Sequence, residues 1–222
     1  MMRGVSRMNS NIRTFSSDKD LVQERRENIR KKATALFARR PFDRNNMRQI
    51  LNQLGMSRGA LYHYVGSKED IRTLIIEYMA NVHIDVHRTL NERIVNMNAT
   101  EALRENIRFI CEYFDKIQNE TIVITHEIGN LSSAEREPHF NSERTNIASV
   151  SDILQRGVET GEFEIDDIQI AAHTIYLMMH AWAVRRWYLR SLYSLEEYIQ
   201  GITTFAQKIV GAKTNPVDGK ND

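Results

Sequence analysis

The sequence predicts an all-α protein, and three observations support that prediction. Residues with high helix propensity, such as Ala, Leu, Glu, Arg and Gln, recur at helical spacing along most of the 222-residue chain. Only three prolines interrupt it, and no alternation of apolar and polar residues is long enough for a strand. With 41% hydrophobic residues, the chain can bury an ordinary core without disulfide or metal staples.

The composition excludes several classes of protein. The single cysteine, Cys111, cannot form an internal disulfide, and no cysteine cluster has zinc-finger spacing. No apolar run reaches the ~18 residues of a membrane span, and the start of the chain lacks the apolar stretch of a signal peptide. These observations predict a cytoplasmic protein with no membrane partner.

Charge is distributed unevenly along the chain. Residues 1–70 contain 15 Lys and Arg against 7 Asp and Glu, so the overall net charge of +1 leaves −7 on the remainder. A basic front on an acidic body suits phosphate binding at one end, because Lys and Arg release counterions from a polyanion that the acidic body avoids. An uneven solvated surface is the alternative interpretation.

The first three predicted helices form a compact motif. A helix from about Asp20 to Arg39 ends before Pro41, and a short one follows over roughly 46–54, with Asn45 placed to cap it. Gly55 ends this second helix, and Ser57 caps a still shorter one over 57–64. Two short helices joined through a glycine are typical of a helix-turn-helix. The buried stripe of the first helix is predicted to contain Ile29, Ala33, Leu36 and Phe37.

The rest of the chain is predicted to be helical as well, giving about nine helices in all. A long helix from Ser67 to about Val95 would connect the motif to the body. The sequence SLEE is a capping box that opens the last helix. Between them, the patterns predict helices at about 100–118, 142–160 and 166–191, with a short piece, TIVITHEIGNL, after the first.

These elements suggest four segments. Residues 1–19 are predicted to be a flexible basic arm, and 20–66 a helix-turn-helix domain. Residues 67–210 form a larger helical domain, and 211–222 a flexible tail.

The helix at 57–64 contains residues that packing alone does not explain. Gly59 in its first turn costs up to about 1 kcal/mol relative to Ala, which is reasonable where another molecule approaches the backbone. Lys68, in the first turn of the next helix, opposes the helix dipole unless an anion binds there. Each residue taken singly is also compatible with an ordinary solvated surface. Four more side chains lie off the apolar face and carry donors suited to phosphates and base edges: Ser57, Arg58, Tyr62 and His63.

Residues 25–75 resemble the DNA-binding domain of the TetR family of bacterial transcriptional repressors. Three positions depart from the family pattern: Pro41, the pair Asn45-Asn46, and Leu51. The resemblance implies an all-helical homodimer that binds a double-stranded, palindromic operator. The matching positions are Ala33, Leu36-Phe37, Phe42, Ile50, Gly55-Met56-Ser57, Gly59, Leu61-Tyr62, Tyr64 and Ser67-Lys68-Glu69. With the residues that open the second helix, the predicted DNA-binding set is Arg44, Asn45, Asn46, Ser57, Arg58, Gly59, Tyr62, His63 and Lys68.

The resemblance also implies a dimer interface and an effector site in the larger domain. The last two helices would pair with their copies across a two-fold axis. The predicted interface residues are Tyr198, Ile199, Ile202, Phe205 and Ile209. Aromatic and thioether side chains with few polar groups suit a small hydrophobic effector. The predicted effector-binding residues are Phe109, Tyr113, Phe114, Glu127, His173, Tyr176, Met179, His180, Trp182 and Arg186.

Two further interpretations of the body are open. The stretch AWAVRRWYLRSLYSLEEYIQ resembles the end of family members that respond to acyl-CoA thioesters, so Arg185, Arg186 and Arg190 could meet the phosphates of such a ligand. A body packed solid, in a ligand-independent DNA-binding or partner-binding regulator, is the alternative.

Metal-dependent and enzymatic functions have little support in the sequence. His83 and His87 lie four residues apart on one helix, but no third ligand is apparent, so we predict no metal site. No nucleophile with its base, Gly-rich phosphate loop or paired carboxylates can be assembled, so we predict neither an enzyme nor a bound cofactor.

Overall fold

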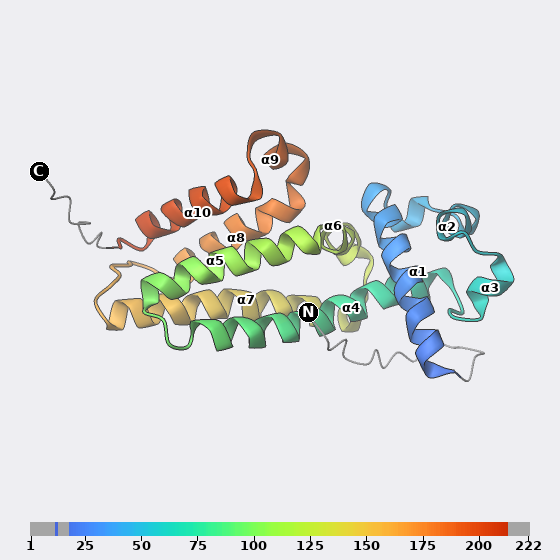
Figure 1. Ribbon diagram of the computed structural model, residues 1–222, viewed down its shortest axis with the longest axis horizontal. Coiled ribbons are helices and arrows are strands. Elements are labelled where there is room, and N and C mark those ends of the chain that lie inside the picture. Colours follow the sequence, from blue (N-terminus) through green and yellow to red (C-terminus); the bar gives the residue numbers. More distant parts are fainter. Residues whose placement is uncertain (1–11, 13–17, 213–222) are drawn as a thin grey trace, which may run out of the picture. The chain divides into compact units, whose positions relative to one another are not determined.

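The computed structural model describes Ile12 and residues 18–212, and it confirms the all-α prediction. Within that part of the chain the only regular elements are ten α-helices and two short 3-10 turns (Figure 1). Most of the predicted arm 1–19 and of the predicted tail 211–222 lies outside the described residues. The helices are α1 (Lys19–Arg39), α2 (Met47–Leu54), α3 (Arg58–Tyr62), α4 (Lys68–Ile94), α5 (Ala99–Lys116), α6 (Gln118–Glu127), α7 (Ser133–Glu159), α8 (Ile168–Val184), α9 (Arg186–Leu192) and α10 (Leu195–Ile209), and the turns are η1 (Phe42–Arg44) and η2 (Ile128–Asn130).

Three elements differ from the predicted ones. The short piece expected after the fifth helix is a full helix, α6. Helix α7 begins nine residues earlier than predicted, because Ser132 and Glu135 form a capping box in which each side chain accepts the other residue's N–H. The apolar segment 166–191 is two helices, α8 and α9, separated at Arg185.

The chain divides into two compact units, which we call the head unit and the body unit. The head unit contains the described residues up to Val86 together with Ile117–Ser142. The body unit contains His87–Lys116 and the described residues from Glu143 onward. Helices α4 and α7 each pass from one unit to the other. The predicted boundary at residue 66 stays a prediction for the extent of the helix-turn-helix domain, and the compact units divide instead within α4 and α7, with α6 packed against α1.

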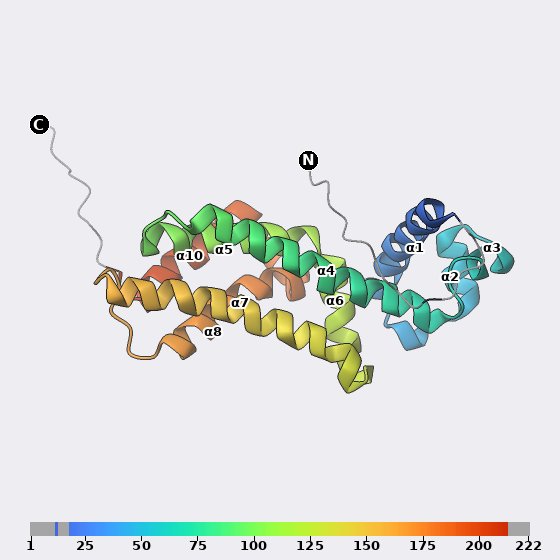
Figure 2. The same ribbon diagram turned by 90° about the horizontal axis from the view of Figure 1, so that it is seen from below.

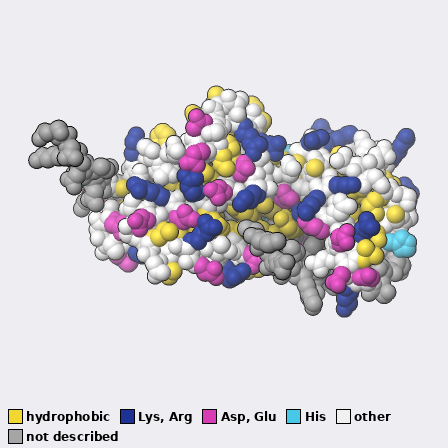
Figure 3. All heavy atoms as spheres, viewed as in Figure 1, with side chains coloured by type: hydrophobic (Ala, Val, Ile, Leu, Met, Phe, Trp, Pro, Cys, Tyr) yellow, Lys and Arg dark blue, Asp and Glu magenta, His cyan; other side chains and the backbone are white. Residues whose placement is uncertain are grey.

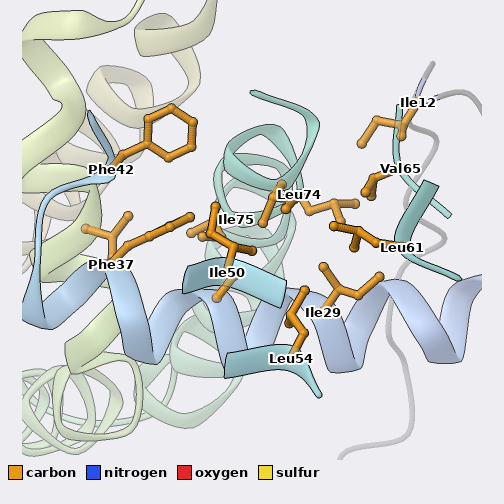
Figure 4. Packing of buried hydrophobic residues seen from close by; sticks show 13 residues of the cluster. Ile12, Ile29, Phe37, Phe42, Ile50, Leu54, Leu61, Val65, Leu74 and Ile75 are labelled. Carbon is orange, nitrogen blue, oxygen red and sulfur yellow. The ribbon is translucent and has the colours of Figure 1, made fainter. Parts of the chain in front are cut away.

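The core of the head unit forms where α1, α2, α3 and the start of α4 converge (Figure 4). Ile29 and Phe37 on α1 meet Ile50 on α2 and Leu61 on α3, and each of these side chains is at most 1% exposed. Burying each one stabilises the fold by roughly 1.5–3 kcal/mol. Val123 of α6 belongs to the same cluster, so α6 completes the core of the helix-turn-helix.

A buried ion pair also ties α6 to α1. Arg30 of α1 is 1% exposed, and its guanidinium lies 2.7 Å from a carboxylate oxygen of Glu120 on α6. The same guanidinium pairs with Glu27 at 2.8 Å and stacks 3.5 Å from the ring centroid of Tyr78 on α4. Because each charge has a close partner, burial of this arginine is tolerated.

The body unit is built around α5, which packs against α8 and α10 (Figure 1). The N-terminus of α5 is capped from a distant part of the chain, because the carboxylate of Glu162 accepts the N–H groups of Ala99 and Thr100 at 3.0 and 2.9 Å. The predicted capping box of the last helix is confirmed between Ser194 and Glu197. Among the residues that the structure describes, no helix is both long and apolar enough to cross a membrane.

Candidate nucleic-acid interface and effector site

The turn between α2 and α3 is fixed by local hydrogen bonds. Asn46 caps α2 in a capping box with Gln49, and Gly55 ends that helix in the left-handed conformation at φ 67°. The Ser57 hydroxyl then accepts the Ala60 N–H at 3.2 Å and caps α3, as predicted. These bonds hold α3 at a defined angle to α2, which is what a helix-turn-helix requires.

The outer face of α3 carries polar side chains that packing within the chain does not require. Leu61 is fully buried beneath it, whereas Ser57, Arg58 and His63 are exposed. A Cβ added to Gly59 would meet no atom within 4 Å, so packing inside the chain does not require glycine there. Of the predicted set on this helix, only Tyr62 is half-buried. The arrangement leaves donors and bare backbone on one surface, suited to the close approach of DNA.

Lys68, which was predicted to contact a DNA phosphate, lies at the start of α4 and has a partner inside the chain. Ser67 accepts the Asp70 N–H at 3.1 Å, and the Asp70 carboxylate accepts the Gly66 N–H at 2.7 Å. The half-buried Lys68 places its ammonium 4.0 Å from the centroid of the Phe42 ring. A cation–π contact thus gives a second reason for a cation at this helix start, and its role toward phosphate stays a prediction.

One predicted DNA contact is wrong. Asn45 is 2% exposed, and its amide nitrogen donates to the carbonyl oxygens of Arg40 and Pro41 at 2.8 and 3.0 Å. The side chain therefore points into the head unit and closes the chain after α1. The predicted capping role falls to Asn46 instead, which is exposed, as is Arg44.

Sequence reasoning missed a further exposed cation next to this surface. Arg48 lies in the first turn of α2 and is exposed. The α2 pattern, with Ile50 and Leu54 buried, already placed residue 48 on the outer side of the helix. In Figure 3, Lys and Arg side chains stand along the upper edge of the head unit.

The predicted effector-binding aromatics come together, but as packed core. Phe114 of α5 lies with its ring centroid 5.2 Å from that of His180 and 6.4 Å from that of Tyr176, both on α8. Tyr176 and His180 stack at 5.8 Å. Tyr113, Phe114, Tyr176, Met179 and Trp182 are each at most 7% exposed, so these rings fill the space between α5 and α8. Half-buried Phe109 instead meets the guanidinium of Arg93, 4.7 Å from its ring centroid.

The predicted polar anchors are scattered. Glu127 lies in the head unit, where one carboxylate oxygen accepts the Phe42 N–H at 3.2 Å and the other is buried without a hydrogen bond to a described residue, so its effector role stays a prediction. His173 is exposed and His180 is inside the aromatic cluster, so they do not line one cavity. Arg186 opens α9, and on the same helix Arg190 pairs with Asp115 of α5.

The body unit has a pocket of about 340 Å³ where α4 and α7 meet. None of the predicted effector residues lines it. Sequence reasoning missed this pocket because its polar residues come from two helices far apart in the chain and include no Phe, Tyr or Trp. The lining residues that bear on its chemistry are His87 and Ile94 of α4, and Ser149, Asp152, Ile153 and Arg156 of α7.

The predicted interface residues fall on two sides of α10. Ile199 and Ile202 are 3% and 6% exposed within a single chain, so they form core and the interface prediction is wrong for them. Phe205 is 61% exposed, whereas Tyr198 is half-buried and donates its hydroxyl to the carbonyl of Met178 at 2.7 Å. The apolar side chains that remain on the surface of α8 and α10 are Ile170, Leu177, Phe205 and Ile209.

Reactive and metal-binding groups are not assembled in the described residues. Cys111 is fully buried, and burial raises the pKa of its thiol to about 12, which keeps it protonated. No group of three His, Cys, Asp or Glu side chains in that part of the chain could hold a metal ion.

Two family models match the chain. Residues 29–73 match the bacterial regulatory proteins of the tetR family, and residues 96–191 match a tetracyclin repressor-like C-terminal domain. The first match coincides with the helix-turn-helix, and the second covers most of the body unit.

Curated relatives and a solved structure agree with these matches. The transcriptional regulator HbdR of Aromatoleum sp. (strain CIB) is 23% identical over 204 residues, which cover 91% of this chain and 88% of HbdR. The transcriptional repressor KstR2 of Rhodococcus jostii (strain RHA1) is 25% identical over 159 residues, 70% of this chain and 76% of KstR2. The structure of AibR with isovaleryl coenzyme A and operator DNA has a TM-score of 0.66 at 19% identity, covering 85% of this chain and 100% of AibR. The chain therefore belongs to the TetR family and is a DNA-binding transcriptional regulator rather than an enzyme.

Proposed function

We propose that the protein is a cytoplasmic repressor that binds a palindromic operator as a homodimer and is released by a small hydrophobic effector. The observation that carries the proposal is the outer face of α3. There Ser57, Arg58 and His63 are exposed above a fully buried Leu61, and the glycine at 59 leaves the backbone open. A short helix held in this way presents its first residues to base edges in the major groove.

Each exposed group on this surface has a separate proposed role. Arg58 is suited to a bidentate contact with guanine, because its guanidinium carries paired donors. Ser57, Asn46 and Arg44 lie at or before helix starts and are suited to phosphate contacts, which set register without selecting sequence. Lys68 adds charge at the start of α4. Arg48 extends the same basic surface.

Dimerisation is proposed through the apolar side chains left on α8 and α10. Ile170 and Leu177 lie seven residues apart on α8, and Phe205 and Ile209 lie four apart on α10, so each pair shares one helix face. Exposed apolar stripes on neighbouring helices mark a protein–protein contact. An isologous pairing of these two helices would give a closed dimer and two α3 helices for a two-fold symmetric operator.

The effector is proposed to be hydrophobic, and acyl-CoA thioesters are the first candidates. AibR, which shares this fold, has been solved in complex with isovaleryl coenzyme A and operator DNA. Ligand binding would shift the population toward a conformation with the α3 helices out of register with the operator. A differential affinity of ~2–3 kcal/mol between the two conformations would lower operator affinity about thirty- to a hundredfold.

The packed aromatic cluster favours the second candidate function, a ligand-independent regulator. Tyr113, Phe114 and Tyr176 fill the space that the sequence assigned to an effector. The pocket between α4 and α7 supports a ligand-responsive regulator, because it offers volume for a small molecule elsewhere in the body unit.

The test selects bound duplexes from a random DNA pool and then challenges the complex with ligands. The proposal expects a palindromic consensus, and release by acyl-CoA thioesters or related acids. Selection of no sequence would contradict operator binding. Release by none of the ligands, with no change in melting temperature, would contradict the effector and leave the ligand-independent regulator.

A further inference from the structure

Unsatisfied polar atoms gather around the pocket between α4 and α7 in the body unit. Figure 2 shows the two helices that supply its walls. The Nε and Nη2 atoms of half-buried Arg156 are themselves buried and make no hydrogen bond to any residue that the structure describes, and the same holds for Nε2 of His87. Buried donors without acceptors are rare in folded proteins, because each one loses its hydrogen bonds to water on folding. Nine described residues carry buried polar atoms of this kind, and Arg156 and His87 are the two that line this pocket, which points to a ligand there.

The guanidinium of Arg156 indicates that the ligand carries a negative charge. Buried Arg30, in the head unit, has carboxylate partners at 2.7 and 2.8 Å, whereas half-buried Arg156 has none among the described residues. A guanidinium presents parallel donors that match the two oxygens of a carboxylate. Burial lowers the pKa of His87, so its imidazole is neutral near physiological pH and can donate one hydrogen bond without adding charge.

The remaining lining residues define the rest of the ligand. Ile94 and Ile153 are buried and supply an apolar wall. The hydroxyl of Ser149 accepts a hydrogen bond from the amide of Asn106 at 3.4 Å, which leaves its own proton free to donate. A volume of about 340 Å³ is at the low end for ligand pockets, which suits a small molecule rather than a whole coenzyme A thioester.

We infer that this pocket binds a small organic acid, with its carboxylate on Arg156 and His87 and its apolar part against Ile94 and Ile153. The inference rests on the proposed function only for its regulatory consequence, since binding itself requires no DNA. Asp152, one helical turn before Arg156, is the acidic member of the lining residues. Its carboxylate would repel the ligand's carboxylate, so the two charged residues have opposite effects on affinity.

The experiment measures ligand binding to the full-length protein in the absence of DNA. The probes are octanoate and 3-phenylpropionate, each paired with its neutral primary amide and its coenzyme A thioester, with calorimetry and thermal shift as readouts. We expect the acids to bind and raise the melting temperature, and each amide to bind about tenfold or more weakly, because a hydrogen bond to a charged group is lost. Failure of both acids to bind at millimolar concentration, or equal affinity for acid and amide, would overturn the inference.

Three substitutions test whether the acids bind in the pocket between α4 and α7. Arg156→Gln should weaken acid binding about ten- to a hundredfold, because it removes the guanidinium. Asp152→Asn should tighten it about two- to fivefold, because it removes the repulsion. The matched control is Arg88→Gln on α4, which removes an exposed arginine paired with Glu92 and should leave acid affinity unchanged. An equal loss in the Arg156 and Arg88 variants would mean nonspecific attraction and would contradict the pocket.

The outcome separates this inference from the proposed function. Stability of the unliganded variants is checked first, and we expect Arg156→Gln to fold as well as the parent, because it removes a half-buried guanidinium whose Nε and Nη2 have no hydrogen-bond partner among the described residues. If the acids bind but do not release the selected operator, the pocket is an acid-binding site that is not the effector site. Operator release by thioesters with no binding of acids would reject the site and keep the proposed function.

Discussion

The two buried arginines of the head unit and the half-buried Arg156 of the body unit differ in their partners, although carboxylate oxygens of Glu77 and Glu127 in the head unit are also buried without a hydrogen bond to a described residue. In the head unit, buried Arg26 donates to the carbonyl oxygens of Tyr64 and Ile12, and buried Arg30 is paired with Glu27 and Glu120. In the body unit, Arg156 keeps two buried nitrogen atoms without partners beside a pocket. The body unit also exposes Phe205 and Leu177.

This difference separates residues that complete a fold from residues that are available to a partner. A buried arginine with close partners stabilises its surroundings, and its removal leaves carboxylates without counterions. An arginine whose donors are unsatisfied lowers stability until something binds, which is typical of functional sites. Four predictions test the comparison, in order of expected effect.

Arg30→Ala should destabilise the head unit the most, by about 3–5 kcal/mol, because it breaks a buried ion pair and leaves Glu120 without its partner. Equilibrium urea unfolding measures the free energy. The control is Lys31→Ala on the same helix, whose exposed ammonium also pairs with Glu27 and should cost less than about 1 kcal/mol. Equal losses in the two variants would contradict the structural role of Arg30.

Phe205→Asp should dissociate the proposed dimer, because a charge in a dry interface costs about 3 kcal/mol or more. Sedimentation velocity should then show monomers whose helical circular dichroism is unchanged. Ile202→Ala on the same helix should instead lower the melting temperature and keep the dimer, since Ile202 is 6% exposed within one chain. An intact dimer in the Phe205 variant would move the interface elsewhere.

Arg58→Ala should change which operator positions are selected and cost ~1–3 kcal/mol per lost base contact. Lys68→Ala should instead weaken all sequences alike and reduce the salt slope by about one unit. Salt titrations of operator binding separate the two roles. If Lys68 serves only the Phe42 ring, its variant will lower the melting temperature and leave the salt slope unchanged.

Glu162→Gln should have the smallest effect, about 0.5–1 kcal/mol, because it weakens the cap of α5. Burial opposes ionisation of Glu162, but hydrogen bonds from Thr100, Ala99 and Thr160 prevail and hold its pKa below the usual 4.5. The carboxylate therefore contributes its full stability above pH 4.5 and loses that contribution as the pH falls through the lowered pKa. Thermal melts should show the difference between variant and parent shrinking below that pH, and a constant difference would contradict the assignment.

The features that the sequence predicted correctly depend on neighbours in the chain. The caps at Ser57 and Ser194 and the helix end at Gly55 are set within four residues, so they are visible as local patterns. The capping box at Ser132 and Glu135 gave the same kind of signal, and its omission shifted the predicted start of α7. The amphipathic stripe of α1 likewise predicted three of its buried residues, Ile29, Ala33 and Phe37, whereas Leu36 is half-buried.

Some residues of the candidate sites were predicted correctly and others were not. The errors occur where the surroundings of a side chain depend on residues that are distant in the chain or on a second chain. The exposed residues of α3 were predicted because one side of a short helix must face outward when Leu61 faces in. The prediction for Asn45 was wrong because an asparagine that precedes a helix has two common roles. It can cap the helix, or its side chain can turn inward and donate to the preceding carbonyl groups, as it does here. Periodicity could not tell whether Ile202 faces its own chain or a second one.

The sequence by itself therefore determined the all-α class, the helix-turn-helix and most helix ends, because propensity, capping and periodicity act over a few residues. Only the tertiary structure decided that α6 completes the head unit, through the pairing of Arg30 with Glu120, ninety residues apart. It also decided that Phe114 and Tyr176 are core, and that the pocket opens between α4 and α7 beside Arg156. Those outcomes depend on whether side chains from distant parts of the chain fill a space or leave it open, and local sequence patterns do not contain that information.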